Sequence, residues 1–217
     1  AWYNRGNCFQ AQGKDVDAIE SYDRALEIKP DYVDAWNNKG EVLYYQGKYE
    51  KAIKCYDTAI EFAPESVTAW YNKGLALHAF GKYDEAVKCY DKTIELAPES
   101  IYAWNNRGLA FYSEGDYEEA LKCYDKVIDS EPSYAKTWYN MGNVLRKQKK
   151  YEEAIKCYDK AIECDPSYEE AMIGKGYSLG MLRKYKEEIT CYDKLLKIND
   201  KNRDALYNRG LAMEDLG

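Results

Sequence analysis

The chain of 217 residues contains a single histidine, His78, and no two cysteines in a CxxC arrangement. A Ser–His–Asp or Cys–His catalytic arrangement would have to use that one histidine. Neither a phosphate-binding glycine loop nor an HExxH zinc motif is present. The sequence therefore predicts that the chain is not an enzyme, holds no metal and uses no cofactor. We expect His78 to be a groove or surface residue.

Long apolar runs and an excess of positive charge are also missing. No stretch approaches the roughly 18 consecutive apolar residues that a membrane helix needs, so we expect no membrane partner. The formal net charge of −7 argues against nucleic acid as a partner, because such binding relies on neutralising phosphates. The composition favours a folded, cytoplasmic protein.

Repetition at a fixed interval of 34 residues dominates the sequence. The tryptophans that follow this interval are Trp2, Trp36, Trp70, Trp104 and Trp138. Seven glycines, all five prolines and five of the seven cysteines have the same spacing. Such a period is typical of solenoid proteins, in which each repeat packs only against its neighbours. The periodic cysteines are expected to be buried thiols in a reducing compartment, without disulfides.

Each repeat is predicted to be a helix–turn–helix hairpin. In the repeat 33–66, apolar residues recur at helical intervals of three and four on both sides of Gly47. Gly47 can adopt the left-handed conformation that ends a helix, and Pro64 ends the second helix. The small residues Gly40 and Ala52 allow the two helices to approach closely. The fold class is therefore all-α.

The pattern resembles the tetratricopeptide repeat (TPR) family, whose motif is W-x2-L-G-x2-Y followed by A-x3-F, A and P. Trp36, Gly40, Ala52, Ala59 and Pro64 stand at motif positions, and the pattern continues through the whole chain without an insertion. The resemblance implies a right-handed superhelical solenoid of TPR hairpins. In that family the first helices line a concave groove.

The period divides residues 1–217 into one array. We expect repeat 1 at 1–32 with its first residues missing, then 33–66, 67–100, 101–134, 135–168, a degenerate sixth repeat at 169–202, and a seventh first helix at 203–217 that caps the array.

Two charged positions recur together. An aspartate follows the conserved second-helix tyrosine in six repeats, and a lysine or arginine replaces the family's leucine in all first helices but one, where Met141 stands. We predict a ladder of ion pairs between residues 16 apart, such as Asp57 and Lys73. The alternative is two sets of independently solvated charges, because exposed pairs contribute little to stability.

The sixth repeat departs from the pattern. Met172 replaces tryptophan, Gly174 replaces asparagine, Arg183 replaces the turn glycine, and Glu188 occupies a small-residue position. We expect the Glu188 carboxylate either to reach solvent or to disturb the packing.

An asparagine two residues after the tryptophan position recurs in six of the seven repeats, as Asn4, Asn38, Asn72, Asn106, Asn140 and Asn208. Asparagine is a poor residue inside a helix. The family resemblance places it in the concave groove, where its amide could pair with one peptide unit of a bound extended chain. It is similar to the asparagine ladder of O-GlcNAc transferase. The alternative is that these amides form hydrogen bonds within the groove or cap neighbouring repeats.

Other predicted groove residues flank the asparagines. The position before each asparagine alternates between tyrosine and asparagine, as Tyr3, Asn37, Tyr71, Asn105 and Tyr139. Further along the first helices are Glu41, Tyr44, His78, Tyr112, Asn143, Arg146, Lys147 and Tyr177. Tyrosines are effective anchors in interfaces.

These features together predict a non-catalytic scaffold that binds an extended peptide or disordered protein segment in its concave groove. One alternative is a substrate-recruiting arm of a larger enzyme, such as a glycosyltransferase. Another is self-association through the terminal repeats.

Hydrogen exchange tests the prediction for the sixth repeat. Because Gly174, Gly176 and Gly180 each weaken a helix by up to about 1 kcal/mol relative to alanine, the amides of 169–202 should exchange faster than those of 101–134. Stronger protection in 169–202 would contradict the prediction.

Overall fold

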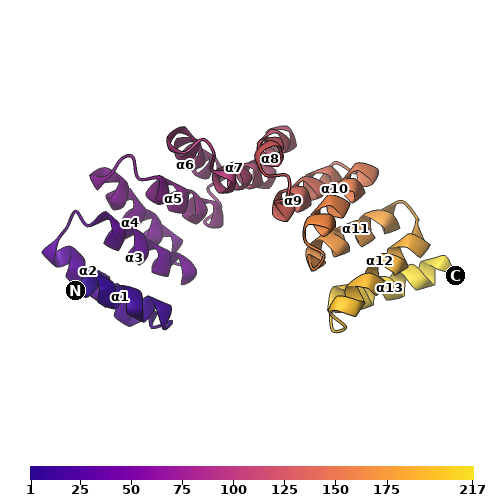
Figure 1. Ribbon diagram of the computed structural model, residues 1–217, viewed down its shortest axis with the longest axis horizontal. Coiled ribbons are helices and arrows are strands. Elements are labelled where there is room, and N and C mark those ends of the chain that lie inside the picture. The colour runs from indigo at the N-terminus through magenta and orange to yellow at the C-terminus, as the bar shows by residue number, and fades with distance from the viewer. The chain divides into compact units, whose positions relative to one another are not determined.

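The computed structural model describes all 217 residues and contains thirteen α-helices joined by short turns (Figure 1). The residues form two compact units, Ala1–Glu114 and Gly115–Gly217. The helices of the first unit are α1 (Trp2–Ala11), α2 (Asp15–Ile28), α3 (Val33–Tyr45), α4 (Tyr49–Phe62), α5 (Val67–Ala79), α6 (Tyr83–Leu96) and α7 (Ile101–Glu114). Those of the second are α8 (Tyr117–Ser130), α9 (Ala135–Lys147), α10 (Tyr151–Cys164), α11 (Glu169–Met181), α12 (Tyr185–Ile198) and α13 (Arg203–Leu216). The all-α prediction of helix–turn–helix repeats is confirmed.

Consecutive helices pack against each other within each unit. In the first unit α1 pairs with α2, α3 with α4 and α5 with α6, and α9 pairs with α10 and α11 with α12 in the second. First helices also contact the first helices that follow them, as α3 contacts α5 and α9 contacts α11. None of the thirteen helices combines the length and apolar character needed to cross a bilayer.

The turn inside each of these hairpins requires one residue whose backbone adopts the left-handed conformation, with a positive φ. Gly47 has a φ of 71°, which glycine adopts without steric cost. Lys149 and Arg183 occupy the equivalent turns of α9–α10 and α11–α12 with φ values of 62° and 59°. A side chain in this conformation costs about 1 kcal/mol, so these two turns are less favourable than the glycine turns.

A tyrosine ring packed on a glycine determines how closely the helices of each hairpin approach. Tyr56 of α4 is 2% exposed, and its ring lies directly against Gly40 of α3. A Cβ atom on Gly40 would lie 2.6 Å from Tyr56 Cε1, closer than carbon atoms can approach. The same contact joins Gly6 to Tyr22, Gly74 to Tyr90, Gly142 to Tyr158 and Gly176 to Tyr192. The periodic glycine is therefore required for close helix packing.

The same ring can also contact the next repeat. In the second unit Tyr158 packs against Gly142 of α9 and against Gly174 of α11, where a Cβ atom would lie 2.7 Å from Tyr158 Cζ. One aromatic side chain thus sets both the spacing within a hairpin and the spacing between this hairpin and the next.

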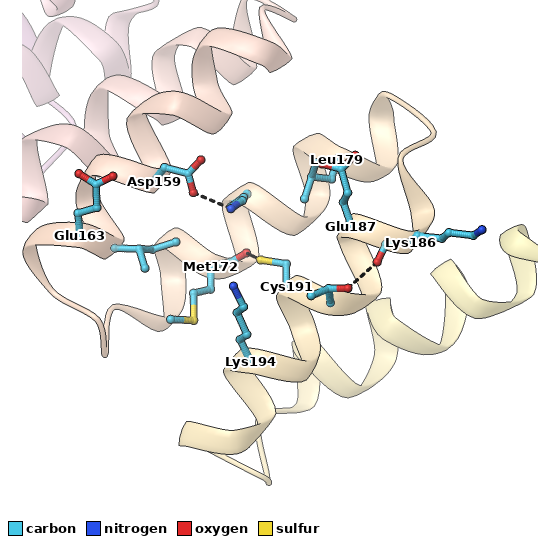
Figure 2. Close-up of a pocket in the computed structure, with 11 residues that line it drawn as sticks. Asp159, Glu163, Met172, Leu179, Lys186, Glu187, Cys191 and Lys194 are labelled. Atoms are coloured by element: carbon cyan, nitrogen blue, oxygen red, sulfur yellow. Dashed lines mark hydrogen bonds and ion pairs between the residues drawn. The ribbon is translucent and has the colours of Figure 1, made fainter.

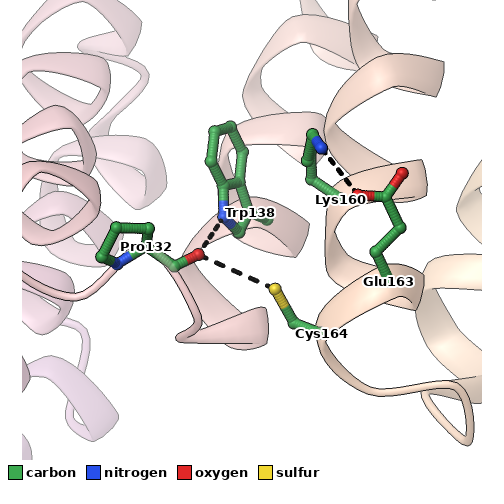
Figure 3. A network of polar contacts seen from close by, with 5 residues as sticks. All are labelled: Pro132, Trp138, Lys160, Glu163 and Cys164. Atoms are coloured by element: carbon green, nitrogen blue, oxygen red, sulfur yellow. Dashed lines mark hydrogen bonds and ion pairs between the residues drawn. The ribbon is translucent and has the colours of Figure 1, made fainter.

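The tryptophans fix the turns between repeats. The indole Nε1 of Trp138 donates a hydrogen bond to the carbonyl oxygen of Pro132, 2.8 Å away, and the Cys164 thiol points at the same oxygen (Figure 3). Equivalent bonds join Trp36 to Pro30, Trp70 to Pro64 and Trp104 to Pro98. Met172 has no such donor, so the sixth repeat lacks this bond.

The predicted ion-pair ladder is confirmed. Lys73 Nζ lies 2.6 Å from Asp57 Oδ1, and it also lies over the ring of Trp70, 5.5 Å from the centroid. The other pairs of this kind are Lys39–Asp23, Arg107–Asp91, Lys175–Asp159 and Arg209–Asp193. The aspartates are roughly half exposed, so each pair contributes on the order of 1 kcal/mol or less.

Asp125 is the one aspartate of the set without this kind of partner, because Met141 stands where the other repeats have a cation. Burial, together with the nearby Asp129, raises the pKa of the Asp125 carboxyl.

Glu188 does not reach solvent, so the first of the two expectations for it was wrong. The residue is 7% exposed, and its carboxylate lies under α11 in the space left by Gly180. A Cβ atom on Gly180 would lie 2.7 Å from Glu188 Oε2. Burial, with a smaller contribution from Asp215, raises the pKa of this carboxyl to about 7.

Alanine substitution at two equivalent glycines separates packing from helix propensity. Gly40→Ala should lower the free energy of unfolding by about 1–3 kcal/mol, because the new methyl group must displace the buried Tyr56 ring. Gly210 holds the same place in α13 with no atom within 4 Å of an added Cβ. Gly210→Ala should instead be neutral or stabilise by up to about 1 kcal/mol. Urea unfolding of both variants checks this, and equal effects would contradict the packing role.

Glu188 should make the protein less stable as pH rises. The unfolded carboxyl loses its proton near its ordinary pKa of 4.5, whereas the folded one keeps it until about pH 7. The folded state therefore binds more protons in this window, and stability falls from about pH 4.5 to 7. Glu188→Gln, which cannot ionise, should unfold like the wild type at pH 4 and be more stable by about 1–3 kcal/mol at pH 8. A stability difference that is the same at both pH values would refute the buried ionisation.

Candidate functional site

The predicted groove residues lie on the first helices, and we call the surface they form the first-helix face of each unit. In the first unit this face comprises side chains of α1, α3, α5 and α7, and in the second those of α9, α11 and α13. Its asparagines do not share one environment. Asn4 is exposed, Asn38, Asn72, Asn106 and Asn208 are half-buried, and Asn140 is 7% exposed.

A hydrogen-bond network occupies the α1–α3 part of the face. Asn38 Nδ2 donates to Asn7 Oδ1 at 3.0 Å and lies 3.2 Å from the Tyr3 hydroxyl. The Tyr22 hydroxyl lies 2.8 Å from the same Asn7 oxygen and 2.6 Å from Gln10 Oε1. Burial raises the pKa of Tyr22 to about 12, so it remains a neutral donor. The amide donors of Asn38 are thus already used within the protein.

Gln10 extends this network to Glu41. Its Nε2 donates to Glu41 Oε2 at 2.9 Å, so this predicted groove carboxylate also has an intramolecular partner.

We call the recurring asparagines, such as Asn38, Asn72 and Asn106, the ladder asparagines. The residue before each of them alternates between tyrosine and asparagine, and this alternation has a structural role. Asn106 Nδ2 donates to the Tyr71 hydroxyl at 2.8 Å, just as Asn38 reaches Tyr3 in the repeat before it. In these two cases the preceding repeat has a tyrosine just before its own ladder asparagine, and the hydroxyl of that tyrosine accepts a hydrogen bond from the next ladder asparagine. Asn72 follows a repeat with Asn37 instead of tyrosine, and no hydrogen bond is found for its side chain.

Two predicted site residues are buried and cannot face a ligand directly. Asn37 is 6% exposed and Asn105 is 1% exposed. The prediction that they contact a ligand needs correction, because both side chains are covered by the surrounding protein. The Asn37 Oδ1 atom is buried without a hydrogen-bond partner. Asn140, also buried, offers little surface.

Aromatic rings cover the middle of the first unit's face. The Tyr44 ring lies 5.4 Å from that of Tyr45 and 5.6 Å from that of Tyr49. His78 of the next first helix packs on Tyr83, and its Nε2 lies 3.2 Å from Ser113 Oγ. Burial lowers the pKa of His78. Tyr112 is half-buried on α7.

The second unit has a pocket of about 270 Å³ on its first-helix face. It is bordered by α9, α11 and α13 and lies beside Gly174, which stands where the other repeats have the recurring asparagine. Five predicted residues line it, namely Tyr139, Asn143, Arg146, Tyr177 and Asn208. Lys147 is exposed on α9 and does not line the pocket. The pocket is the place where the structure brings most predicted residues together.

The polar groups of this pocket are held in place by the core. The Tyr158 hydroxyl donates to Asn143 Oδ1 at 2.9 Å, and Arg146 Nε lies 3.3 Å from that hydroxyl. The Arg146 guanidinium also lies over the Tyr177 ring, 5.3 Å from its centroid. The pocket therefore combines a positioned cation and amide with aromatic walls, which suits a polar backbone or an anionic group beside an apolar one.

Four lining residues were not predicted: Glu170, Ile173, Gly174 and Asp204. Glu170 and Asp204 add two carboxylates to the lining that also contains Arg146. Gly174 could have been found from the sequence, because it is the one break in the series of recurring asparagines. No set of three or more His, Cys, Asp or Glu residues is arranged to hold a metal ion.

Family models for the tetratricopeptide repeat match most of the chain. One model described as "Tetratricopeptide repeat" matches 1–32, 67–100 and 135–168, and another matches 21–54 and 89–122. A model described as "TPR repeat" matches 40–81 and 108–148. Together the matches extend over residues 1–168. No curated protein sequence matches the chain.

Solved structures of TPR proteins have a similar fold. A tetratricopeptide repeat protein from Parabacteroides merdae is 19% identical with a TM-score of 0.82, covering 99% of this chain and 85% of its own. MamA from Desulfovibrio magneticus RS-1 is 20% identical with a TM-score of 0.70, covering 79% and 97%. YrrB, described as a TPR protein with an unusual peptide-binding site, is 20% identical with a TM-score of 0.65, covering 89% and 100%. At these identities the likeness shows the fold alone.

Proposed function

Because the chain belongs to the tetratricopeptide repeat family, we propose that it is a non-catalytic scaffold that binds an extended protein segment on its first-helix faces. TPR domains typically mediate protein–protein interactions. We further propose that residues 1–217 act as one array with the seven repeat windows given above. The description of YrrB as a TPR protein with a peptide-binding site supports a peptide-binding role of this type.

The pocket at Gly174 is the observation that carries the proposal. It places Asn143, Arg146 and Asn208 around one space with tyrosine walls. A peptide unit presents one donor and one acceptor, which the amides can match, and the guanidinium suits a carboxylate or carbonyl oxygen. A side chain of the bound segment would enter the pocket beside Gly174.

The asparagines contribute unequally in this proposal. Asn72 and Asn208 have no hydrogen bond within the protein that would need to be broken, so their donors are available to a ligand. Asn38 and Asn106 retain an acceptor oxygen, while their donors hold tyrosines in place. We therefore propose that these two residues shape the face and that Asn72 and Asn208 contact the ligand.

Peptide selection on the full chain tests the proposal. Phage-displayed random peptides would be selected on immobilised protein and measured by fluorescence anisotropy. The double variant Arg146→Gln/Asn208→Ala should bind selected peptides at least about tenfold more weakly, since it loses a charge-assisted and a neutral hydrogen bond. Arg203→Gln, which removes the same charge from an exposed site on α13 outside the pocket, should bind normally. Unchanged affinity in the double variant would refute this site.

A second variant tests the ladder in the first unit. Asn72→Ala should weaken the binding of peptides that contact this unit. Asn106→Ala should instead lower the thermal stability of the protein, because it removes the hydrogen bond to Tyr71. If Asn72→Ala leaves the affinity of every selected peptide unchanged, the first unit does not use its asparagine in binding.

A further inference from the structure

Pockets also lie between successive second helices, away from the first-helix face. One of about 610 Å³ lies between α10, α11 and α12 (Figure 2). Another of about 500 Å³ lies between α2, α3 and α4 at equivalent positions of the repeat. Each is bordered by a pair of the ion-pair ladder, Asp159–Lys175 in the first and Asp23–Lys39 in the second.

The two pockets differ in charge. In the pocket of Figure 2, Lys186 and Lys194 are accompanied by the carboxylates of Glu163 and Glu187. The pocket between α2 and α4 contains Lys39, Lys48, Lys51 and Lys54, and its single carboxylate, Asp23, is already paired with Lys39. We call this second site the lysine pocket. Three of its ammonium groups have no carboxylate within ion-pair distance.

One residue of the lysine pocket departs from the pattern of the other second helices. The place of Lys51 is acidic in the other second helices, as Asp17, Glu85, Glu119, Glu153 and Glu187. Two of these acids pair with lysines three residues away in the chain, at 2.8 Å for Lys82–Glu85 and 2.6 Å for Lys122–Glu119. In α4 a lysine takes the acid's place, so Lys48 and Lys54 lose the partner that this pattern provides.

No other polar contact compensates for the loss. Among the side chains of Lys48, Lys51 and Lys54, the sole hydrogen bond is from Lys48 Nζ to Gln46 Oε1 at 2.7 Å. Like charges placed together on one helix destabilise it. The clustering of these three lysines therefore destabilises the folded protein, and no carboxylate within ion-pair distance compensates for their repulsion.

The floor of the lysine pocket is apolar. Ile19, Trp36 and Leu43 line it together with Cys55. Burial raises the pKa of the Cys55 thiol to about 11, so the cysteine is a neutral part of the floor. A ligand that fits must offer an apolar group to the floor and negative charge to its rim.

We propose that the lysine pocket binds a short acidic segment of another protein, with an apolar side chain between its carboxylates. The chain as a whole carries a net charge of −7. The lysine pocket is therefore a local positive site on a negative molecule, which attracts a short acidic segment and repels a polyanion whose charge extends beyond the pocket. This surface is separate from the first-helix face and does not depend on the function proposed for it.

A designed peptide tests this proposal. Fluorescein-labelled Glu-Glu-Leu-Glu-Phe-Glu-Glu would be titrated with the full chain and followed by anisotropy, beside the same peptide with glutamine for glutamate. The acidic peptide should bind more tightly, and its affinity should fall as salt rises. Lys51→Glu restores the acidic residue of the other repeats and should weaken binding about tenfold or more.

Matched variants complete the experiment. Lys156→Glu makes the same charge change on α10, beside Glu153 and outside the lysine pocket, and should leave binding unchanged. Arg146→Gln/Asn208→Ala should also bind the acidic peptide normally, which separates this site from the first-helix face. Unfolding curves establish that each variant is folded.

Three outcomes would overturn the proposal. The first is equal affinity of the acidic peptide for the wild type and Lys51→Glu. The second is an equal loss of affinity in Lys156→Glu, which would indicate a general charge effect. The third is tighter binding of a single-stranded RNA oligonucleotide that displaces the peptide, which would assign the pocket to a polyanion.

Discussion

The contact between a buried tyrosine ring and a glycine backbone is the constraint on which the hairpins depend. The ring of Tyr56 or Tyr158 fills space that any side chain on the facing helix would occupy. In two repeats the tyrosine hydroxyl also donates a hydrogen bond to an asparagine on the first-helix face. Tyr22 donates to Asn7, and Tyr158 donates to Asn143. The core residue that spaces the helices thus also positions polar groups of the candidate site.

The sixth repeat shows what happens when this arrangement is altered. Tyr192 keeps its place against Gly176, but its hydroxyl is buried without a partner. Tyr177 stands where the fifth repeat has Asn143, so no amide is present to accept the bond. The same repeat contains the buried Glu188 and lacks the tryptophan bond. The sixth repeat therefore lacks several stabilising interactions that other repeats have, and it lies next to the pocket at Gly174.

Much of the fold could be predicted from the sequence because it depends on local chemistry. Gly47 and Pro64 mark the helix ends, and the spacing of Asp57 and Lys73 was enough to pair them, because one period fixes which residues of adjacent helices meet. The prediction failed where several conformations are available to one side chain. The period could not reveal that Asn37 is covered, nor that Glu188 turns under Gly180 and stays buried.

The candidate site was predictable in outline only. Tyr139, Arg146 and Asn208 were expected on one surface, and they line one pocket. That Asn38 and Asn106 use their donors within the protein depends on the tyrosine one repeat earlier, a relation that appears only when neighbouring helices are in place. Lys51 lies on α4, a second helix, whereas the groove pattern of the sequence concerns first helices alone.

The alternation of tyrosine and asparagine before the ladder position means that neighbouring repeats are not interchangeable. Along the first unit, an amide with free donors alternates with one whose donors are held by a tyrosine. A bound chain that slid along this unit by one repeat would exchange one kind of contact for the other. It would recover equivalent contacts only after moving by two repeats. The repeating unit that a ligand meets is therefore two repeats long, which corresponds to twice the 34-residue period of the sequence. A doubled repeat gives a bound segment a defined register, which a uniform ladder of asparagines would not provide.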